Sequence, residues 1–540
     1  MILLLLACAT PEAPAPGDGI TLLSPRKQLI RLSVDLRGVH PTETELQAIE
    51  ANPDLYDDYV SRYLQDPRFL DRMEEIWNQQ FLTRTGETYF GLDGFPADER
   101  LLADSVGDEP LKLVRWIIEN DRPWSEIVTA DHSMADPLLA AWWNMEYPQG
   151  ASGWQPAHYQ DGRPEAGVLS MTTLWQRYPS AGANSNRHRA NQVSRILLCD
   201  DFLARPVSFG RAAVDALTTG DPEDVIRDNG VCQSCHSSLD PIAAGFYGFW
   251  WEVKGDRTAQ TTYYPEDEEL WRDHAGKAPA FAGVAVNGLP ELGERLATDT
   301  RLTQCATKVV VEGLTQRTLD PVLDWNSQET YRKALEDSGQ VMRELVRSIV
   351  ESREYRAAAF ADARAERIPT LKTVGPTQLA AIIEEKTGYR WSFGGRDGLT
   401  QNDMGLVVLA GGIDSVLVTI PNHEPSVSVA LIQERLAQSA GFYVASHDLD
   451  PNRTDAAILL KYVTGLDTPT SNPDAFGAQI KDLYLQITGQ PLLANENEEP
   501  AEVAELMTLW QNLYTVDSSP VSAWAGIVSV VLRDPLVLFY

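Results

Sequence analysis

The sequence has few of the residues that hold metals or carry redox chemistry. Among 540 residues there are five cysteines, eight histidines and eight methionines. There is no H-E-x-x-H motif, no H-x-x-x-H pair and only one C-x-x-C. These absences remove the usual ligand patterns of zinc proteases and zinc fingers. Paired carboxylates or a Ser-His-Asp order would indicate another catalytic class, and the sequence shows neither.

Basic residues are scarce too. The chain has 45 Lys and Arg against 77 Asp and Glu, which gives a net charge of −32. Such a surface repels nucleic acid, so we expect no nucleic-acid partner. It suits a salty medium or a basic protein, although simple solubility is the interpretation that we favour.

Long apolar segments are also missing, and no stretch is long enough to cross a bilayer. The short apolar start, Met1 to Cys8, resembles a bacterial lipoprotein signal, with Cys8 as the lipidated residue. It lacks a basic n-region, which is compatible with a true start upstream. Residues 9–19 are rich in Pro, Ala and Gly and predict a flexible tether. The alternative is an ordinary frayed N-terminus.

The one C-x-x-C is followed at once by a histidine, as Cys232-Gln-Ser-Cys235-His236. C-x-x-C-H is the pattern of covalent haem attachment. Two thiols three residues apart lie on one face of a helical turn, so each can add to one haem vinyl group. His236 then becomes the proximal iron ligand. We expect Asp240-Pro241 to end this helix soon afterwards.

Two other interpretations of these cysteines stay open. The pair is also compatible with a redox or structural disulfide, although the strand-to-helix setting of thioredoxin-like motifs is not visible here. Half of a zinc site is the other alternative, but the second pair of ligands is missing from the sequence.

The residues around this motif carry a resemblance. Cys232-x-x-Cys235-His236-x-x-Leu239-Asp240-Pro241 is similar to the C-x-x-C-H-x-x-hydrophobic-D-P block of the planctomycete-type cytochrome c family, large secreted bacterial proteins of largely unknown function. Many members have Met in place of Leu239. The N-terminal block Leu32-x-x-Asp35-Leu36-x-Gly38 also fits the family. The resemblance covers patches from Arg31 to about Arg356 and a Gly-Gly-Ile-Asp block near residue 412.

The expected fold is mostly α, a multi-domain helical protein with a cytochrome c-like haem-binding segment in its middle domain. A chain of this length predicts about three domains. We place the signal and tether at 1–19, an N-terminal helical domain at 20–150, the cytochrome c-like domain at 151–368 and a C-terminal helical domain at 369–540. Residues 145–164 are expected to be a long loop or a domain joint.

Two arginines precede the haem motif. In so acidic a chain, Arg187 and Arg189 are candidates to hold the haem propionates by charge-assisted hydrogen bonds. Salt bridges to the protein's own surface carboxylates explain them equally well.

The distal iron ligand is not evident from the sequence. Methionine would favour a high reduction potential, histidine a lower one, and an open position would permit chemistry on small molecules. His274, Met342, Met171 and His188 are the candidates, and each is also explained as an ordinary core or surface residue.

Two cysteines remain, and both fall in segments that resemble the family. A disulfide between Cys199 and Cys305 would close a loop of about a hundred residues and stabilise the fold by up to ~4–5 kcal/mol. Two separate buried thiols are the alternative. The bridge requires a Cα–Cα distance below about 7 Å.

The function that we expect is a c-type cytochrome-like electron carrier with one covalent haem c. The site and the lipidation signal point to the periplasm or an outer-membrane anchor through Cys8, and to a redox partner protein. A haem-dependent oxidoreductase with an open distal site is the first alternative. A non-haem structural or binding lipoprotein with disulfides is the second.

Overall fold

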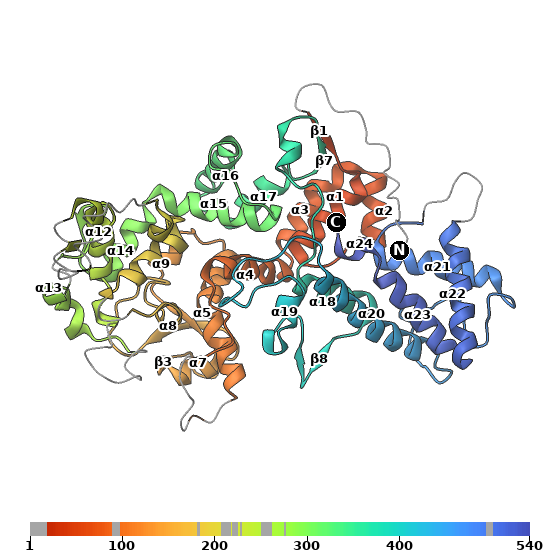
Figure 1. Cartoon of the computed structure of the whole chain (residues 1–540). Coiled ribbons are helices and arrows are strands. Elements are labelled where there is room, and N and C mark those ends of the chain that lie inside the picture. The colour runs from red at the N-terminus through yellow and green to blue at the C-terminus, as the bar shows by residue number, and fades with distance from the viewer. Residues whose placement is uncertain are drawn as a thin grey trace. The chain divides into compact units, whose positions relative to one another are not determined.

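The structure is a computed structural model of the whole chain (Figure 1). It describes residues 19–88, 95, 98–180, 184–206, 218, 225–226, 229–249, 262–274, 277–492 and 500–540. The described part is mostly helical with a few short strands, as the sequence predicts. Cys8 and residues 9–18 of the tether lie outside the described residues. None of the helices in these ranges has the length and apolar character to span a bilayer.

The chain divides into two compact units. Among the described residues, unit 1 joins 19–72 to Leu314–Thr318 and Ile349–Tyr540, and unit 2 consists of Met73–Gly313 and Leu319–Ser348. This differs from the three consecutive domains that we predicted, with boundaries at 150 and 368. The physical reason is a strand pair: β1 (Ile20–Leu22) is antiparallel to β7 (Ala357–Phe360), so the N-terminal segment belongs with the last third of the chain.

The first helices of unit 1 begin and end where their capping residues predict. Helix α1 (Pro25–Arg37) starts after Ser24, whose side chain accepts from the Lys27 amide, and ends at Gly38 in the left-handed conformation. Helix α2 (Glu43–Ala51) has the expected capping box of Thr42 and Glu45.

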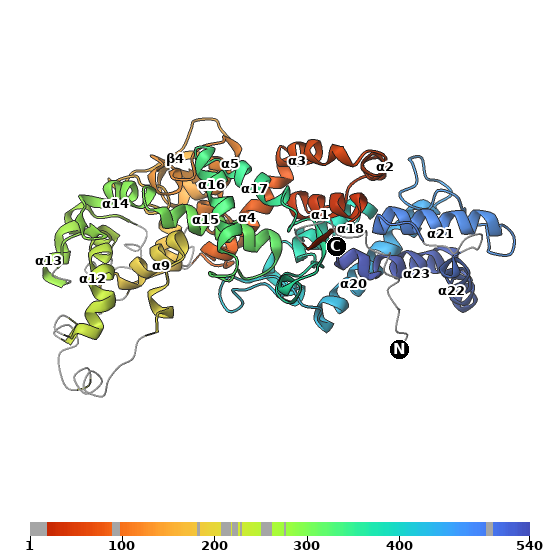
Figure 2. The same ribbon diagram turned by 90° about the horizontal axis from the view of Figure 1, so that it is seen from above.

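The rest of unit 1 is a set of packed helices. Helices α20 (Val427–Asp448), α22 (Ala501–Asp517) and α23 (Pro520–Leu532) lie side by side in both views (Figures 1 and 2). Trp510 of α22 and Trp524 of α23 are buried against Phe476. Its further elements are α3 (Tyr56–Leu64), α18 (Pro376–Thr387), β8 (Ser392–Phe393), β9 (Arg396–Asp397), α19 (Leu406–Leu409), α20 (Val427–Asp448), α21 (Pro473–Thr488), α22 (Ala501–Asp517), α23 (Pro520–Leu532) and α24 (Pro535–Leu538).

Unit 2 begins within α4 (Pro67–Phe81) and carries the haem motif. Its helices are α5 (Glu99–Glu119), α6 (Glu126–Thr129), α7 (Pro137–Trp142), α8 (Thr172–Arg177), α9 (Arg187–Leu198), α12 (Gly230–Ala244), α13 (Trp271–His274), α14 (Gly288–Ala297), α15 (Thr300–Thr315), α16 (Trp325–Asp337) and α17 (Met342–Val350). The short 3₁₀ helix η4 (Tyr247–Phe249) follows α12.

Residues 145–164 are partly a sheet rather than a loop. Strand β4 (Gln155–Tyr159) pairs with both β2 (Ser133–Ala135) and β3 (Met145–Glu146), all antiparallel. Ala135, Met145 and Ala157 from the three strands are buried in one cluster with Leu102 and Val106 of α5. The Gly and Pro residues that suggested a loop lie mostly between the strands and after them.

A disulfide joins two helices of unit 2. Cys199, the C-cap of α9, is bonded to Cys305 of α15, with the Cα atoms 5.2 Å apart and a sequence separation of 106. This is the pairing considered above, and its Cα separation lies within the required limit. The bridge fixes the C-terminal end of α9, which packs against the haem-motif helix α12.

Candidate haem-attachment site

The three residues of the haem motif lie on one continuous helix. Asn229 caps α12 by accepting a hydrogen bond from the Val231 amide at 2.9 Å. We expected α12 to end at Asp240-Pro241. The helix instead continues to Ala244, with Pro241 inside it. The prediction was wrong because a proline near the end of a helix removes one hydrogen bond without forcing the chain out of the helix.

Both motif cysteines are free thiols. Cys232 is buried and Cys235 is partly exposed, and neither is bonded to the other or to another described cysteine. At positions i and i+3 of an α-helix they share one face, as covalent attachment to one flat ring requires. The structure therefore contains no disulfide between Cys232 and Cys235.

The histidine of the motif has a buried carboxylate as its partner. His236 Nδ1 lies 2.8 Å from Asp240 Oδ1, one helical turn further along α12. A carboxylate only accepts, so Nδ1 is the protonated nitrogen and donates to Asp240. This arrangement leaves Nε2 as the nitrogen with a lone pair for a metal ion.

Asp240 is also bound by an arginine from the neighbouring helix. Arg187 Nε donates to the same Oδ1 atom at 2.9 Å, and the Asp240 side chain is only 3% exposed. Burial alone would raise the pKa of Asp240, but the hydrogen bonds from His236 and Arg187 outweigh it and lower that pKa below its usual value. The carboxylate therefore stays charged.

Arg189 has a different environment. It is 1% exposed and donates to the Phe249 carbonyl at 2.9 Å and to Asn186 Oδ1 at 3.1 Å. No carboxylate among the described residues contacts it, and its Nε and the Asn186 Nδ2 have no hydrogen-bond partner. Burial lowers the pKa of Arg189 to about 9. A buried cation with unsatisfied donors calls for an anion that the described residues do not supply.

The two arginines of the predicted propionate pair are therefore not equivalent. Arg187 is bound to the protein's own Asp240, a buried carboxylate rather than the surface carboxylate of our alternative. Arg189 lies 5.8 Å from the ring centroid of Trp175, which in turn packs on Phe246 and Phe249 after the haem motif.

The four candidate distal ligands do not gather at one point. His188 lies on α9, the helix packed on α12, and the exposed His274 stacks on Tyr247 with ring centroids 6.2 Å apart. Met171 and Met342 are 0% and 1% exposed in the hydrophobic core.

Within those same ranges, no three His, Cys, Asp or Glu side chains gather as ligands of a metal ion. A zinc ion at Cys232 and Cys235 would need such a set. A c-type haem needs only two thiols and one axial histidine from this helix.

The chain has no match among protein-family models, curated proteins or solved structures. The interpretation of the site therefore depends on its own residues and their chemistry.

Sequence reasoning missed two residues of the site. It treated Asp240 as a helix terminator, although the four-residue spacing from His236 was a usable signal for a contact on one helix face. It also missed Lys277, whose Nζ donates to the His236 carbonyl at 3.3 Å and to Gln233 Oε1 at 3.2 Å. No local pattern marks a lysine forty residues further along the chain.

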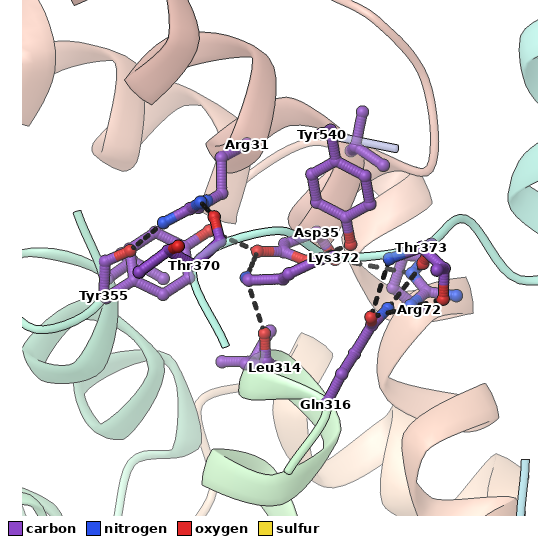
Figure 3. Close-up of polar contacts among 12 residues, drawn as sticks. Arg31, Asp35, Arg72, Leu314, Gln316, Tyr355, Thr370, Lys372, Thr373 and Tyr540 are labelled. Atoms are coloured by element: carbon purple, nitrogen blue, oxygen red, sulfur yellow. Dashed lines mark hydrogen bonds and ion pairs between the residues drawn. The ribbon is translucent and has the colours of Figure 1, made fainter. Parts of the chain in front are cut away.

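A second buried polar cluster lies in unit 1 (Figure 3). Asp35 accepts from Lys372 Nζ, from Tyr355 Oη at 2.5 Å and from Tyr540 Oη at 2.6 Å. Lys372 also donates to the Leu314 carbonyl, and burial lowers its pKa to about 8. Asp35 and Lys372 are both 3% exposed. Such burial suits a structural cluster that joins distant segments of one unit, not chemistry on a diffusible substrate.

Proposed function

We propose that the protein is an exported c-type cytochrome-like electron carrier with one covalent haem c on Cys232 and Cys235 and with His236 as proximal ligand. The observation that carries the proposal is the state of the three motif residues. The two thiols are free on one helix face, and the histidine is oriented by a buried carboxylate that leaves Nε2 for the iron.

The residues present fit the group. Each thiol S–H would add across one vinyl C=C, with sulfur bonding the inner carbon and hydrogen the outer one, so that no atom leaves. Arg189 and Asn186, with their unsatisfied buried donors, are suited to a propionate. When bound, the haem would supply a one-electron couple between Fe(III) and Fe(II).

Export and anchoring belong to the same proposal. The Cys199–Cys305 disulfide is typical of an oxidising compartment. Covalent haem attachment and the lipoprotein-like segment ending at Cys8 point the same way, to the periplasm or to an outer-membrane anchor. The acidic surface suits a basic redox partner protein.

The test is maturation of the whole chain in cells that carry a haem-attachment system. The expected product is coloured, keeps its Soret band through acid-acetone extraction and has an intact mass increased by one haem. C232A/C235A, which removes both thiols but leaves His236, should lose the covalent band. A colourless wild-type product of unmodified mass would leave the non-haem lipoprotein as the alternative.

A haem-dependent oxidoreductase is the second candidate, and Asp240 is the observation that favours it. A carboxylate on the proximal imidazole enriches the axial ligand in electrons, which suits an iron that activates a small oxidant at an open distal position. Carbon monoxide binding to the reduced form distinguishes the two: an electron carrier with both axial positions filled should bind it poorly, and an open site should bind it tightly.

A further inference from the structure

The hydrogen-bond partner of His236 bears on the behaviour of the iron that it would hold. An imidazole whose Nδ1–H donates to a carboxylate gains electron density, and its Nε2 becomes a stronger donor to a metal ion. A stronger donor stabilises the higher charge of the metal. In this protein the carboxylate is 3% exposed and forms an ion pair with Arg187, so water screens the interaction little.

Arg187 opposes this effect at the same atom. Its Nε and the His236 Nδ1 both contact Asp240 Oδ1, at 2.9 and 2.8 Å. The guanidinium withdraws charge from the oxygen that the imidazole also uses, and adds a positive charge, 9% exposed in its side chain, near the ligand. Arg187 comes from α9 and Asp240 from α12, so the packing of these two helices sets the balance.

We propose that Asp240 and Arg187 set the reduction potential of the iron held by His236, with Asp240 lowering it and Arg187 raising it. The inference rests on the proposed haem function and extends it by naming the two residues that tune the site. Both are positioning residues, because neither bonds the iron. Among the described residues, Lys277 also contacts His236, at the backbone carbonyl and not at the ring.

The experiment is spectroelectrochemical titration of the matured, haem-loaded protein and its variants. Asp240→Asn keeps the shape and an acceptor oxygen but removes the negative charge that His236 and Arg187 both contact. It should raise the midpoint potential enough to change the ratio of reduced to oxidised protein at least tenfold, which is about 59 mV for one electron. Arg187→Gln should lower the potential, and the double variant should return toward the wild-type value.

Matched variants separate tuning from folding. Asp121→Asn removes a carboxylate from a different arginine pair, with Arg343, and asparagine tolerates the positive φ of 49° found there, so the potential should not change. Asp240→Glu and Arg187→Lys keep the charges and should stay closer to wild type than Asp240→Asn and Arg187→Gln.

The outcomes distinguish the two proposals. A wild-type protein without covalent haem overturns the proposed function. A haem-loaded protein in which Asp240→Asn and Arg187→Gln shift the potential in the same direction, or not at all, overturns the tuning inference alone. If Asp240→Asn does not mature, the direction of the shift in Arg187→Gln and the smaller shift in Arg187→Lys decide it.

Discussion

At the scale of single residues, the buried polar groups of unit 1 have well-defined partners. Asp35 on α1 receives hydrogen bonds from residues more than 300 positions away in sequence, Tyr355, Lys372 and Tyr540 (Figure 3). A charged acceptor with three donors is stabilised by each of them, since water cannot replace a donor that is lost. The contribution of each hydrogen bond to the free energy of unfolding should therefore be measurable with a single substitution.

The first prediction concerns the hydroxyl of Tyr540. Tyr540→Phe removes one hydrogen bond to a buried carboxylate and should lower the free energy of unfolding by about 1.5–3 kcal/mol. Chemical denaturation followed by circular dichroism measures it. Tyr389→Phe removes a hydroxyl for which the structure gives no partner and should change stability by less than about 0.5 kcal/mol. Equal effects of the two substitutions would contradict the prediction.

The second prediction concerns pH. Burial, followed by the nearby charge of Lys386, lowers the pKa of His40 from 6.5 to about 3 in the folded protein. Below pH 6.5, His40 therefore binds a proton in the unfolded chain but not in the folded protein. Its contribution to the free energy of unfolding is fully present above pH 6.5 and is lost as the pH falls toward 3. The loss from this group is about 2 kcal/mol at pH 5.

Unfolding curves at pH 7 and pH 5 measure this loss. His40→Gln, which cannot titrate, should show a smaller difference between the two pH values than wild type. His447 gives the opposite control: hydrogen bonds to Asp448 and Asp455 raise its pKa, so that group stabilises at low pH. His447→Gln should enlarge the acid-induced loss. If both substitutions change the acid-induced loss of stability in the same direction, the opposite pKa shifts of His40 and His447 are contradicted.

At the scale of elements, the sequence predicts best those features that depend on interactions between residues close together in the chain. Ser24, Gly38 and the Thr42/Glu45 box act within one turn, and α1 and α2 begin and end where they predict. The sequence predicts a helix from about Glu109 to Glu119, but α5 begins ten residues earlier, at Glu99 after the Asp98 cap. Strand β4 depends on partners more than ten residues away and was missed.

The candidate site shows the same division. The spacing of Cys232, Cys235 and His236 is readable because it is one turn of one helix. The Arg187–Asp240 pair spans 53 residues and requires two helices to pack, which no local pattern encodes. The unsatisfied donors of Arg189 became visible only once its surroundings were known.

The third prediction concerns the contact between α20 and α23. A Cβ atom added at Gly441 would lie 2.5 Å from the Ala525 carbonyl oxygen and 3.1 Å from the Ser529 amide nitrogen. Gly441→Ala should therefore push the helices apart and destabilise unit 1 by about 1–3 kcal/mol. Gly465→Ala, where the nearest atoms lie 3.9 Å away, is the control. Thermal unfolding of both variants measures the effect, and similar melting temperatures would argue against close packing here.

The fourth prediction concerns the disulfide. Replacing both Cys199 and Cys305 by alanine should cost about 2–5 kcal/mol, because the bridge closes a loop of 106 residues. Denaturation of this variant should match that of reduced wild type. If the oxidised wild type and the double variant unfold at the same denaturant concentration, the bridge does not form.

At the scale of the whole molecule, the excess of acidic residues affects the stability of the folded state. A net charge of −32 opposes compaction, and the repulsion reaches about 30 Å at 10 mM salt but only about 8 Å at 150 mM. The fifth prediction is that the melting temperature rises between these two concentrations of NaCl. KCl at the same ionic strength should act equally, since screening does not depend on the cation. An unchanged or falling melting temperature would mean that local charge pairs outweigh the net repulsion.

The interleaving of the two units also orders events in time. Unit 2 is complete once residue 348 has been made, whereas α1 of unit 1 must wait for β7, Lys372 and the helices that follow. During synthesis, the segment with Cys232, Cys235 and His236 can thus reach its folded surroundings while the earliest helices still lack their neighbours. A ribosome-stalled or truncated chain ending near residue 348 would carry a finished second unit and an unprotected beginning.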